Sequence, residues 1–170
     1  MTVEQLVLAL NTVQPSLIRT EADEITYNLH IILRFELELQ LMTGKLQVKD
    51  IPEAWTEQMR ELIGIVPPTD KEGVLQDVHW AWGNIGYFPT YTLGNLNAAQ
   101  LLVSFEKAHP KWSEEVASGN FTSYFNWFKE HIWQHGSMYT PAEIMTTVTS
   151  ESTKPEFLLS YLRQKYLTKI

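Results

Sequence analysis

The segment from Thr20 to about Met42 constrains the fold most, because its apolar residues recur at helical spacing along its whole length. Thr20 can cap a helix there, and the acidic residues after it favour the positive end of the helix dipole. The apolar positions form one stripe and a second row that widens it: Ile25, Leu29, Ile32 and Leu39, then Leu33, Leu37 and Leu41. The sequence therefore predicts a long helix that is buried on more than one side.

The rest of the chain also favours helices. Helical spacing of apolar residues predicts a helix from Val3 that Pro15 ends, and two more over residues 52–62 and 91–108. Four further helices are expected after residue 108, and the capping-box spacing of Thr140 and Glu143 in "TPAE" predicts the start of one of them. No strand-rich region or internal repeat competes with these helices. We therefore predict a mainly α fold, in which only the loop over residues 73–91 could hold short strands.

Composition excludes several classes of function. The formal net charge of the 170 residues is −7, and Lys and Arg do not cluster, so neither nucleic acid nor a membrane surface is an expected partner. The chain has no cysteine, which excludes disulfides, thiol catalysis and zinc–thiolate sites. Neither a signal peptide nor an apolar run long enough to span a membrane is found, so a cytoplasmic protein is expected.

The loop "GVLQDVHWAWGNIGYFPTY", residues 73–91, concentrates an acid, a histidine and several aromatic rings. In an extended backbone Asp77 would lie on the same side as His79 and could orient its ring. Tyr87 and Tyr91 follow two glycines that let a loop approach a ligand, and phenols can donate to a developing oxyanion. A loop that closes over a ligand and an aromatic cluster that pins the loop to the core both fit these residues.

Arg19, in "SLIRTEADE", stands just before the predicted long helix. Its planar guanidinium could bind a carboxylate, such as the terminus of a substrate. The structural alternative is an ion pair with Asp23 or Glu24 together with ordinary capping of the helix. The residue types alone do not distinguish these two possibilities.

Three polar residues inside the long helix have plainer explanations. Arg34 and Glu38 are one helical turn apart, which predicts a pair on the helix face. His30 is interpreted as a histidine of the core or its boundary. None of the three is assigned a catalytic role.

The histidines of "EHIWQH", His131 and His135, have the spacing of two zinc ligands on one helix. The zincin motif also needs a glutamate directly after the first histidine as general base, and Ile132 stands there instead. The favoured interpretation is a helix end before Gly136, where histidines suit the negative helix terminus. No metal ligand is therefore assigned in this chain.

Two boxes, "LIRTEAD" and "GVLQDVHW", resemble the Ile/Val-Arg-x-x-Ala-Asp and Gly-x-x-Gln-Asp-x-His-Trp signatures of the carboxypeptidase Taq family of zinc metallocarboxypeptidases. The flanking "QPSLIRTEADEITYNLHIILRFELE", "GYFPTYTLGN" and "HGSMYTPAEI" also look like this family, so the resemblance covers nearly the whole chain. Both boxes are complete, and their residues carry over by position: Arg19, Ala22, Asp23, Gly73, Gln76, Asp77, His79 and Trp80.

The resemblance implies a helical, zincin-type enzyme that releases single amino acids from peptide C-termini, depends on zinc and is usually dimeric. In that family a His-Glu-x-x-His helix and a later glutamate bind the zinc, and both precede the arginine box. This chain contains neither. Residues 1–170 are thus expected to be one helical region, the C-terminal part of a larger metallocarboxypeptidase domain, which binds no zinc alone and needs a zinc-binding N-terminal half as partner.

The resemblance also suggests roles for individual residues. The expected catalytic side chains are His79, Tyr87 and Tyr91. The expected substrate-binding side chains are Arg19, Asp23, Gln76, Asp77 and Trp80. The alternative is a helical remnant without enzymatic activity, or a module that binds a partner through the apolar faces of its first two helices.

Overall fold

A computed structural model describes residues 1–167 and divides the chain into two compact units, residues 1–92 and residues from 93 onward. The described residues form helices and turns and no strand, which confirms the predicted mainly α fold. No helix within this part of the chain combines the length and the apolar character that crossing a membrane requires. That residues 1–170 form one region of a larger domain stays a prediction.

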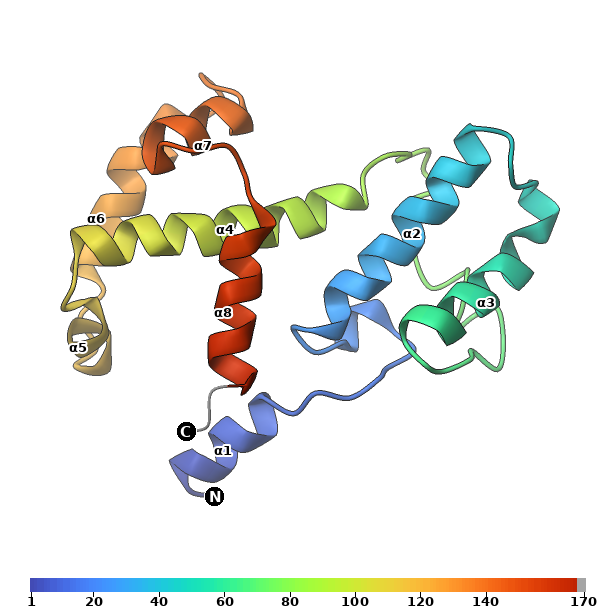
Figure 1. Cartoon of the computed structure of the whole chain (residues 1–170), viewed down its shortest axis with the longest axis horizontal. Coiled ribbons are helices and arrows are strands. Elements are labelled where there is room, and N and C mark those ends of the chain that lie inside the picture. The colour runs from blue at the N-terminus through green and yellow to red at the C-terminus, as the bar shows by residue number, and fades with distance from the viewer. Residues whose placement is uncertain (168–170) are drawn as a thin grey trace. The chain divides into compact units, whose positions relative to one another are not determined.

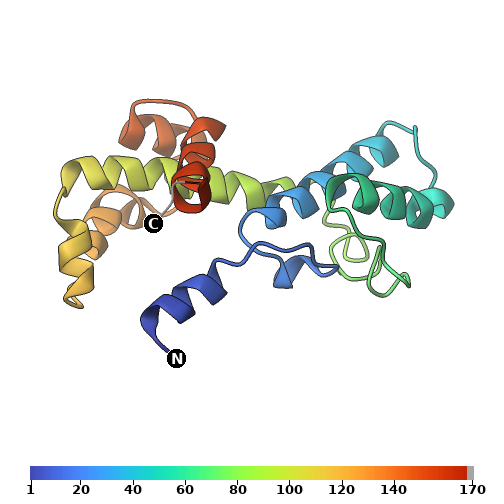
Figure 2. The same cartoon turned by 60° about the horizontal axis from the view of Figure 1, so that its bottom comes forward.

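The first unit is built on two helices that lie side by side, α2 and α3 (Figures 1 and 2). Its elements are α1 (Val3–Leu10), η1 (Arg19–Glu21), α2 (Thr26–Met42), η2 (Val48–Asp50) and α3 (Ile51–Leu62). Their core contains the buried side chains of Leu33, Leu37, Trp55, Met59 and Ile63. Burial of these large apolar groups supplies the main stabilisation of the unit.

The long helix begins at Thr26, so the prediction that Thr20 starts it is wrong. Thr20 lies within the 3-10 turn η1, and Asp23 provides the cap instead. One carboxylate oxygen of Asp23 accepts hydrogen bonds from the backbone N–H groups of Ile25 and Thr26, both at 2.9 Å. The carboxylate accepts from two free N–H groups of the first helical turn. Its negative charge also interacts favourably with the positive end of the helix dipole, which a hydroxyl does not do.

The loop between α3 and α4 (Pro89–Ala108) forms a series of turns. The short strands that seemed possible there are not formed. Gly83 and Gly86 have φ values of 75° and 78°, in the left-handed region that an extended strand excludes. Backbone hydrogen bonds from Gly83 to Trp80 and from Asn84 to His79 close the turn.

The second unit continues along α4 and adds four helices, in agreement with the prediction: α5 (Trp112–Ala117), α6 (Thr122–His131), α7 (Pro141–Thr149) and α8 (Pro155–Leu167), with η3 (Trp133–His135) after α6. Phe105 is fully buried, and the rings of Trp127 and Tyr124 pack edge-on against it. The predicted capping box at Thr140 and Glu143 is formed and starts α7.

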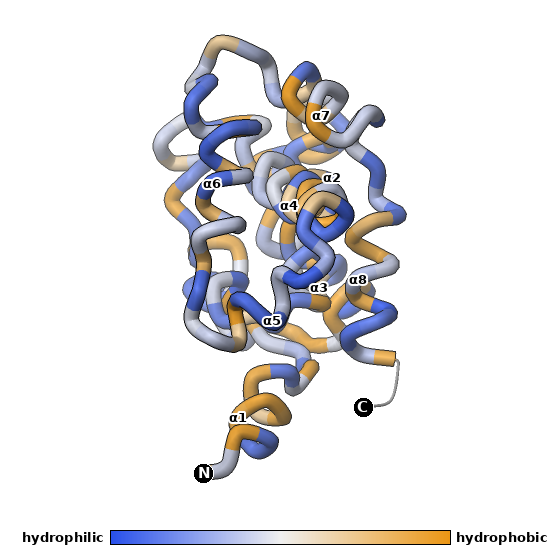
Figure 3. The backbone as a smooth tube through the Cα atoms, turned by 90° about the vertical axis from the view of Figure 1, so that its left-hand side faces the viewer, coloured by the Kyte–Doolittle hydropathy of each residue, from blue (hydrophilic) through white to orange (hydrophobic). Residues whose placement is uncertain are grey.

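Apolar side chains remain exposed on both helices that precede α3. Figure 3 colours α1 mostly as hydrophobic, and none of its residues is buried. On α2 one face buries Ile31, Leu33 and Leu37, while the opposite face exposes apolar residues at helical spacing: Ile32, Phe35, Leu39 and Met42. The expectation that Ile32 and Leu39 belong to the buried stripe is therefore wrong within this unit. We call these four residues the outer α2 face.

We expect the isolated chain to self-associate through this exposed apolar surface, because contiguous apolar patches of this kind usually mark contacts with another protein. Sedimentation velocity over a concentration series should show oligomers. The double substitution Phe35→Glu and Leu39→Glu should shift the chain toward monomer. Gln134→Glu with Gln164→Glu, two exposed positions elsewhere, adds the same charge and should not. A wild-type chain that stays monomeric throughout would contradict this prediction.

Candidate functional site

The two sequence boxes meet in the first unit through Arg19 and Asp77. Arg19 Nη2 donates to Asp77 Oδ1 at 2.8 Å, and its Nη1 donates to the Tyr27 hydroxyl at 3.0 Å. Its guanidinium carbon also lies 4.9 Å from the centre of the Tyr91 ring, in cation–π geometry. Arg19 thus pairs with Asp77 of the loop, and the alternative partner Asp23 is used to cap α2 instead.

Asp77 also forms an ion pair with Arg34, although the sequence predicted that Arg34 would pair with Glu38. Arg34 is fully buried; its Nε donates to Asp77 Oδ2 at 2.7 Å, and its Nη2 lies 2.6 Å from the same oxygen. The expected helix-face pair is therefore wrong. Arg34 lies on the buried side of α2, where an unpaired guanidinium would be costly, and Asp77 is the carboxylate that the loop brings to it.

One carboxylate thus faces two guanidinium groups. Although burial alone would raise the pKa of Asp77, the hydrogen bond from Arg19 and the charge of Arg34 hold it below its usual range. Burial lowers the pKa of Arg34 to about 10, and Asp77 limits the decrease. All three groups are therefore charged at neutral pH, and the cluster carries a net positive charge.

Glu38 binds the same loop at two other points. Its Oε1 accepts from Trp80 Nε1 at 2.7 Å and its Oε2 accepts from the backbone N–H of Gly86 at 3.2 Å. Only 3% of Glu38 is exposed. Sequence reasoning missed Arg34 and Glu38 as loop contacts. The available signal was their position between the rows of the apolar stripe, which places two charges on a buried face.

His79 lies between Asp77 and Tyr91. Its Nε2 is 3.0 Å from the Tyr91 hydroxyl, and its Nδ1 is 3.8 Å from Asp77 Oδ1, too far for a hydrogen bond. Which ring nitrogen carries the proton decides whether Nε2 donates to the Tyr91 hydroxyl or accepts from it. The structure therefore brings together the acid, the histidine and both tyrosines that the sequence singled out, with Tyr91 within hydrogen-bond distance of His79 and Tyr87 stacked on its ring.

Two further rings of the loop, Tyr87 and Phe88, pack against this histidine. Phe88 is buried, with its centre 4.4 Å from that of His79, and Trp80 packs edge-on against Phe88 and Trp55. This arrangement is the aromatic cluster that pins the loop. Tyr87 is different, because it is 49% exposed while its ring stacks on His79 at 5.7 Å. The cluster thus presents one exposed phenol beside the histidine.

Gln76 joins the two boxes through their backbones. Its Oε1 accepts from the Arg19 N–H at 3.0 Å, and its Nε2 lies 3.1 Å from the carbonyl oxygens of Leu17, Glu72 and Gly73. These contacts fix the segment around Arg19 against the turn that precedes Asp77. A larger residue at Gly73 would be crowded, because an added Cβ would lie 3.2 Å from Pro67.

Within residues 1–167, no group of three or more metal-ligating side chains lies close enough together to hold a metal ion. His131 is the last residue of α6, as the helix-end interpretation predicts, and its Nδ1 lies 2.9 Å from the Trp127 carbonyl oxygen. His135 follows on η3 instead of continuing the helix. The residues described here therefore do not fit the zinc that the resemblance implies.

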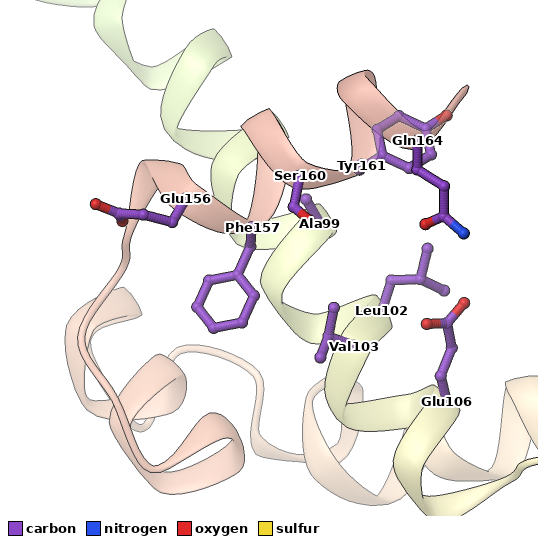
Figure 4. Close-up of a pocket in the computed structure, with 9 residues that line it drawn as sticks. All are labelled: Ala99, Leu102, Val103, Glu106, Glu156, Phe157, Ser160, Tyr161 and Gln164. Atoms are coloured by element: carbon purple, nitrogen blue, oxygen red, sulfur yellow. The ribbon is translucent and has the colours of Figure 1, made fainter. Parts of the chain in front are cut away.

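A groove of about 370 Å³ lies in the second unit, between α4 and α8 (Figure 4). Leu102, Val103 and Phe157 form its apolar wall, and Glu106 and Glu156 stand at its edges. None of the sequence-predicted site residues lines it. We assign it no ligand.

His30 is the buried histidine that sequence reasoning expected. It is fully buried on α2, and burial and the charge of Arg34 lower its pKa from 6.5 to about 4. The folded state therefore favours the neutral ring. The contribution of neutral His30 to the stability of the unit is complete above pH 6.5 and is lost as the pH falls from there toward 4.

We expect acid to destabilise the first unit, and the contribution of His30 to this loss is about 3 kcal/mol between pH 7 and pH 4. In His30→Leu, the slope of unfolding free energy against pH over this range should become smaller. Urea unfolding at a series of pH values measures it. His135→Gln, which removes a histidine from the second unit, serves as control. An unchanged slope in His30→Leu would contradict the prediction.

Comparison with known proteins places this chain in a family. The family described as carboxypeptidase Taq (M32) metallopeptidase matches residues 1–166. Thermostable carboxypeptidase 1 of Thermus thermophilus is 47% identical over 163 residues, and that of Pyrococcus furiosus is 44% identical over 166 residues. The matched regions cover 96% and 98% of this chain, but 32% and 33% of the two relatives.

The chain is also similar to solved structures of carboxypeptidases. An M32 carboxypeptidase from Deinococcus radiodurans R1 superposes with a TM-score of 0.95 at 42% identity, covering 98% of this chain and 34% of that one. Metallocarboxypeptidase 1 of Trypanosoma cruzi gives a TM-score of 0.93 at 37% identity, with 98% and 35% covered. The chain therefore belongs to the carboxypeptidase Taq metallopeptidase family. It spans about a third of the length of the curated relatives it matches.

Proposed function

We propose that this chain supplies the substrate-facing side of a metal-dependent carboxypeptidase that releases single C-terminal amino acids from peptides. The observation that carries this proposal is the joining of the two family boxes, in which Arg19 and Asp77 meet beside His79. The cluster is positively charged and partly buried, which suits a site that receives a peptide carboxylate.

Each residue of the cluster has a proposed part. Arg19 supplies positive charge at the closed end of the substrate groove, while Asp77 and Tyr27 fix its guanidinium. Tyr87, exposed beside His79, donates to the oxyanion that develops during hydrolysis, together with His79. Tyr91 orients His79 through its hydroxyl. Asp23, Gln76 and Trp80 support substrate binding by fixing the backbone around these groups.

We propose that zinc, which would activate water and polarise the scissile carbonyl, is held by a part of the metallocarboxypeptidase fold that this chain lacks. The relatives are about three times longer than the matched region. The outer α2 face and α1 are the surfaces that this zinc-binding part would cover. On this view the chain alone is inactive.

A second candidate is a partner-binding module without activity, which the same exposed apolar surfaces favour. A second copy of the chain is one partner that such a surface could take. The two proposals differ in one respect, because only the first requires that the partner bring zinc.

Complementation tests the first proposal. The chain is co-expressed with the residues of Thermostable carboxypeptidase 1 from Thermus thermophilus that lie outside the matched region. Hydrolysis of a blocked dipeptide is then measured. We expect turnover with both parts and none with either alone. A stable complex without turnover would favour the partner-binding module.

A further inference from the structure

Glu38 ties two separate points of the loop to α2. Its two carboxylate oxygens accept from Trp80 Nε1 and from the Gly86 N–H, at 2.7 and 3.2 Å. The turn of residues 81–85 lies between these points, and all five of its residues are exposed. A single buried side chain thus fixes the width of an otherwise solvent-exposed turn.

The residues proposed to contact substrate are the immediate neighbours of these two points. His79 directly precedes Trp80, and Tyr87 directly follows Gly86. Their rings stack with centres 5.7 Å apart. The distance between the histidine and the exposed phenol therefore depends on the two ends of the turn that Glu38 holds.

The chemistry of this position suits a carboxylate. A carboxylate offers two acceptor oxygens, so each oxygen can accept from one of the two separate N–H groups. Burial of a carboxylate is costly, and an apolar side chain at position 38 could fill the same space without that cost. Core stability alone does not account for a charge here, whereas holding two N–H groups of the loop does.

We propose that Glu38 is a positioning residue that sets the relative placement of His79 and Tyr87 by bridging Trp80 and Gly86. Arg34, one helical turn earlier, holds Asp77 and so fixes the loop before His79. The inference deepens the proposed function and rests on it for the roles of His79 and Tyr87. The bridge itself can be tested without activity.

The first test is amide hydrogen exchange and NMR on the chain. Glu38→Gln keeps the shape but can accept only through one oxygen, so the Gly86 amide should exchange ~10-fold faster, as expected for a lost hydrogen bond to a charged group. The ring resonances of His79 should shift, while amides of α2 and α3 keep most of their protection. Glu36→Gln, an exposed carboxylate on the same helix, is the matched control. A uniform loss of protection across the unit, or an unchanged Gly86 amide, would overturn the proposal.

Trp80→Phe provides an independent variant, because it removes one of the two donors and keeps a ring in place. It should shift the His79 resonances in the same direction as Glu38→Gln, and unshifted resonances would overturn the proposal.

The last arm uses the complemented enzyme. Glu38→Gln should lower kcat with little change in KM, because the substrate still binds while the oxyanion donors are misplaced. A change in KM alone would overturn the positioning role. Full turnover in His79→Ala would instead contradict the proposed function, and the Gly86 exchange result would still decide whether the bridge exists.

Discussion

Substituting Asp77 by Ala should destabilise the first unit by about 3 kcal/mol or more, because it leaves Arg19 and Arg34 buried without a countercharge. Arg19 and Arg34 are only 7% and 0% exposed, so water cannot fully replace the lost carboxylate without opening the unit. Native-state hydrogen exchange of the α2 amides measures the change in the unit that contains the substitution.

Two variants make this result specific. Asp77→Asn keeps the shape and removes the charge, and it should lose most of the same stability. Glu61→Ala, an exposed carboxylate on α3, should change the unfolding free energy by less than about 0.5 kcal/mol. If Asp77→Ala costs no more than this control, the cluster of Arg19, Arg34 and Asp77 is not what holds the loop.

In the complemented enzyme, His79→Ala should lower turnover by roughly 100-fold, the usual effect of removing one oxyanion donor. Tyr87→Phe should lower it too, because the exposed phenol loses its donor. Tyr91→Phe should act through His79, by releasing the Nε2 that lies 3.0 Å from its hydroxyl. Steady-state hydrolysis of a blocked dipeptide measures all three.

The control is a histidine outside the loop. His131→Ala removes an imidazole at the end of α6, in the second unit, and should leave turnover unchanged. Wild-type turnover in both His79→Ala and Tyr87→Phe would show that the loop does not take part in the chemistry.

Local patterns predicted much of this fold. Apolar spacing predicted the α-helices up to residue 108 apart from their exact ends, and the box at Thr140 and Glu143 predicted the start of α7. The start of α2 was predicted too early. A threonine followed by acids looks like a cap, but the side chain that binds the free N–H groups is Asp23.

The candidate site was predictable only where its residues are neighbours in sequence. Asp77 and His79 are two positions apart, and the structure brings them together. The contacts that hold the loop join residues about forty positions apart, Arg34 with Asp77 and Glu38 with Trp80. Helical periodicity shows which face a residue occupies but not what packs against it, so the simplest interpretation paired Arg34 with Glu38.

The same geometry changes how Arg19 is understood. A free guanidinium beside a helix start would bind a substrate carboxylate directly, but this one is already occupied by Asp77 and Tyr27. We therefore propose that its positive charge attracts the substrate carboxylate over a short distance, while its guanidinium holds the loop. Arg19→Lys should accordingly weaken the loop contacts as well as binding, since an ammonium cannot make both planar contacts.

We propose that this chain forms the side of a peptidase site that receives a free peptide C-terminus. The most direct test measures hydrolysis by the complemented enzyme of one blocked dipeptide in two forms, with a C-terminal carboxylate and with a C-terminal amide. We predict rapid hydrolysis of the acid and little of the amide, because the positive cluster recognises the carboxylate. Equal hydrolysis of both forms, or none of either with zinc bound to the partner, would contradict the claim.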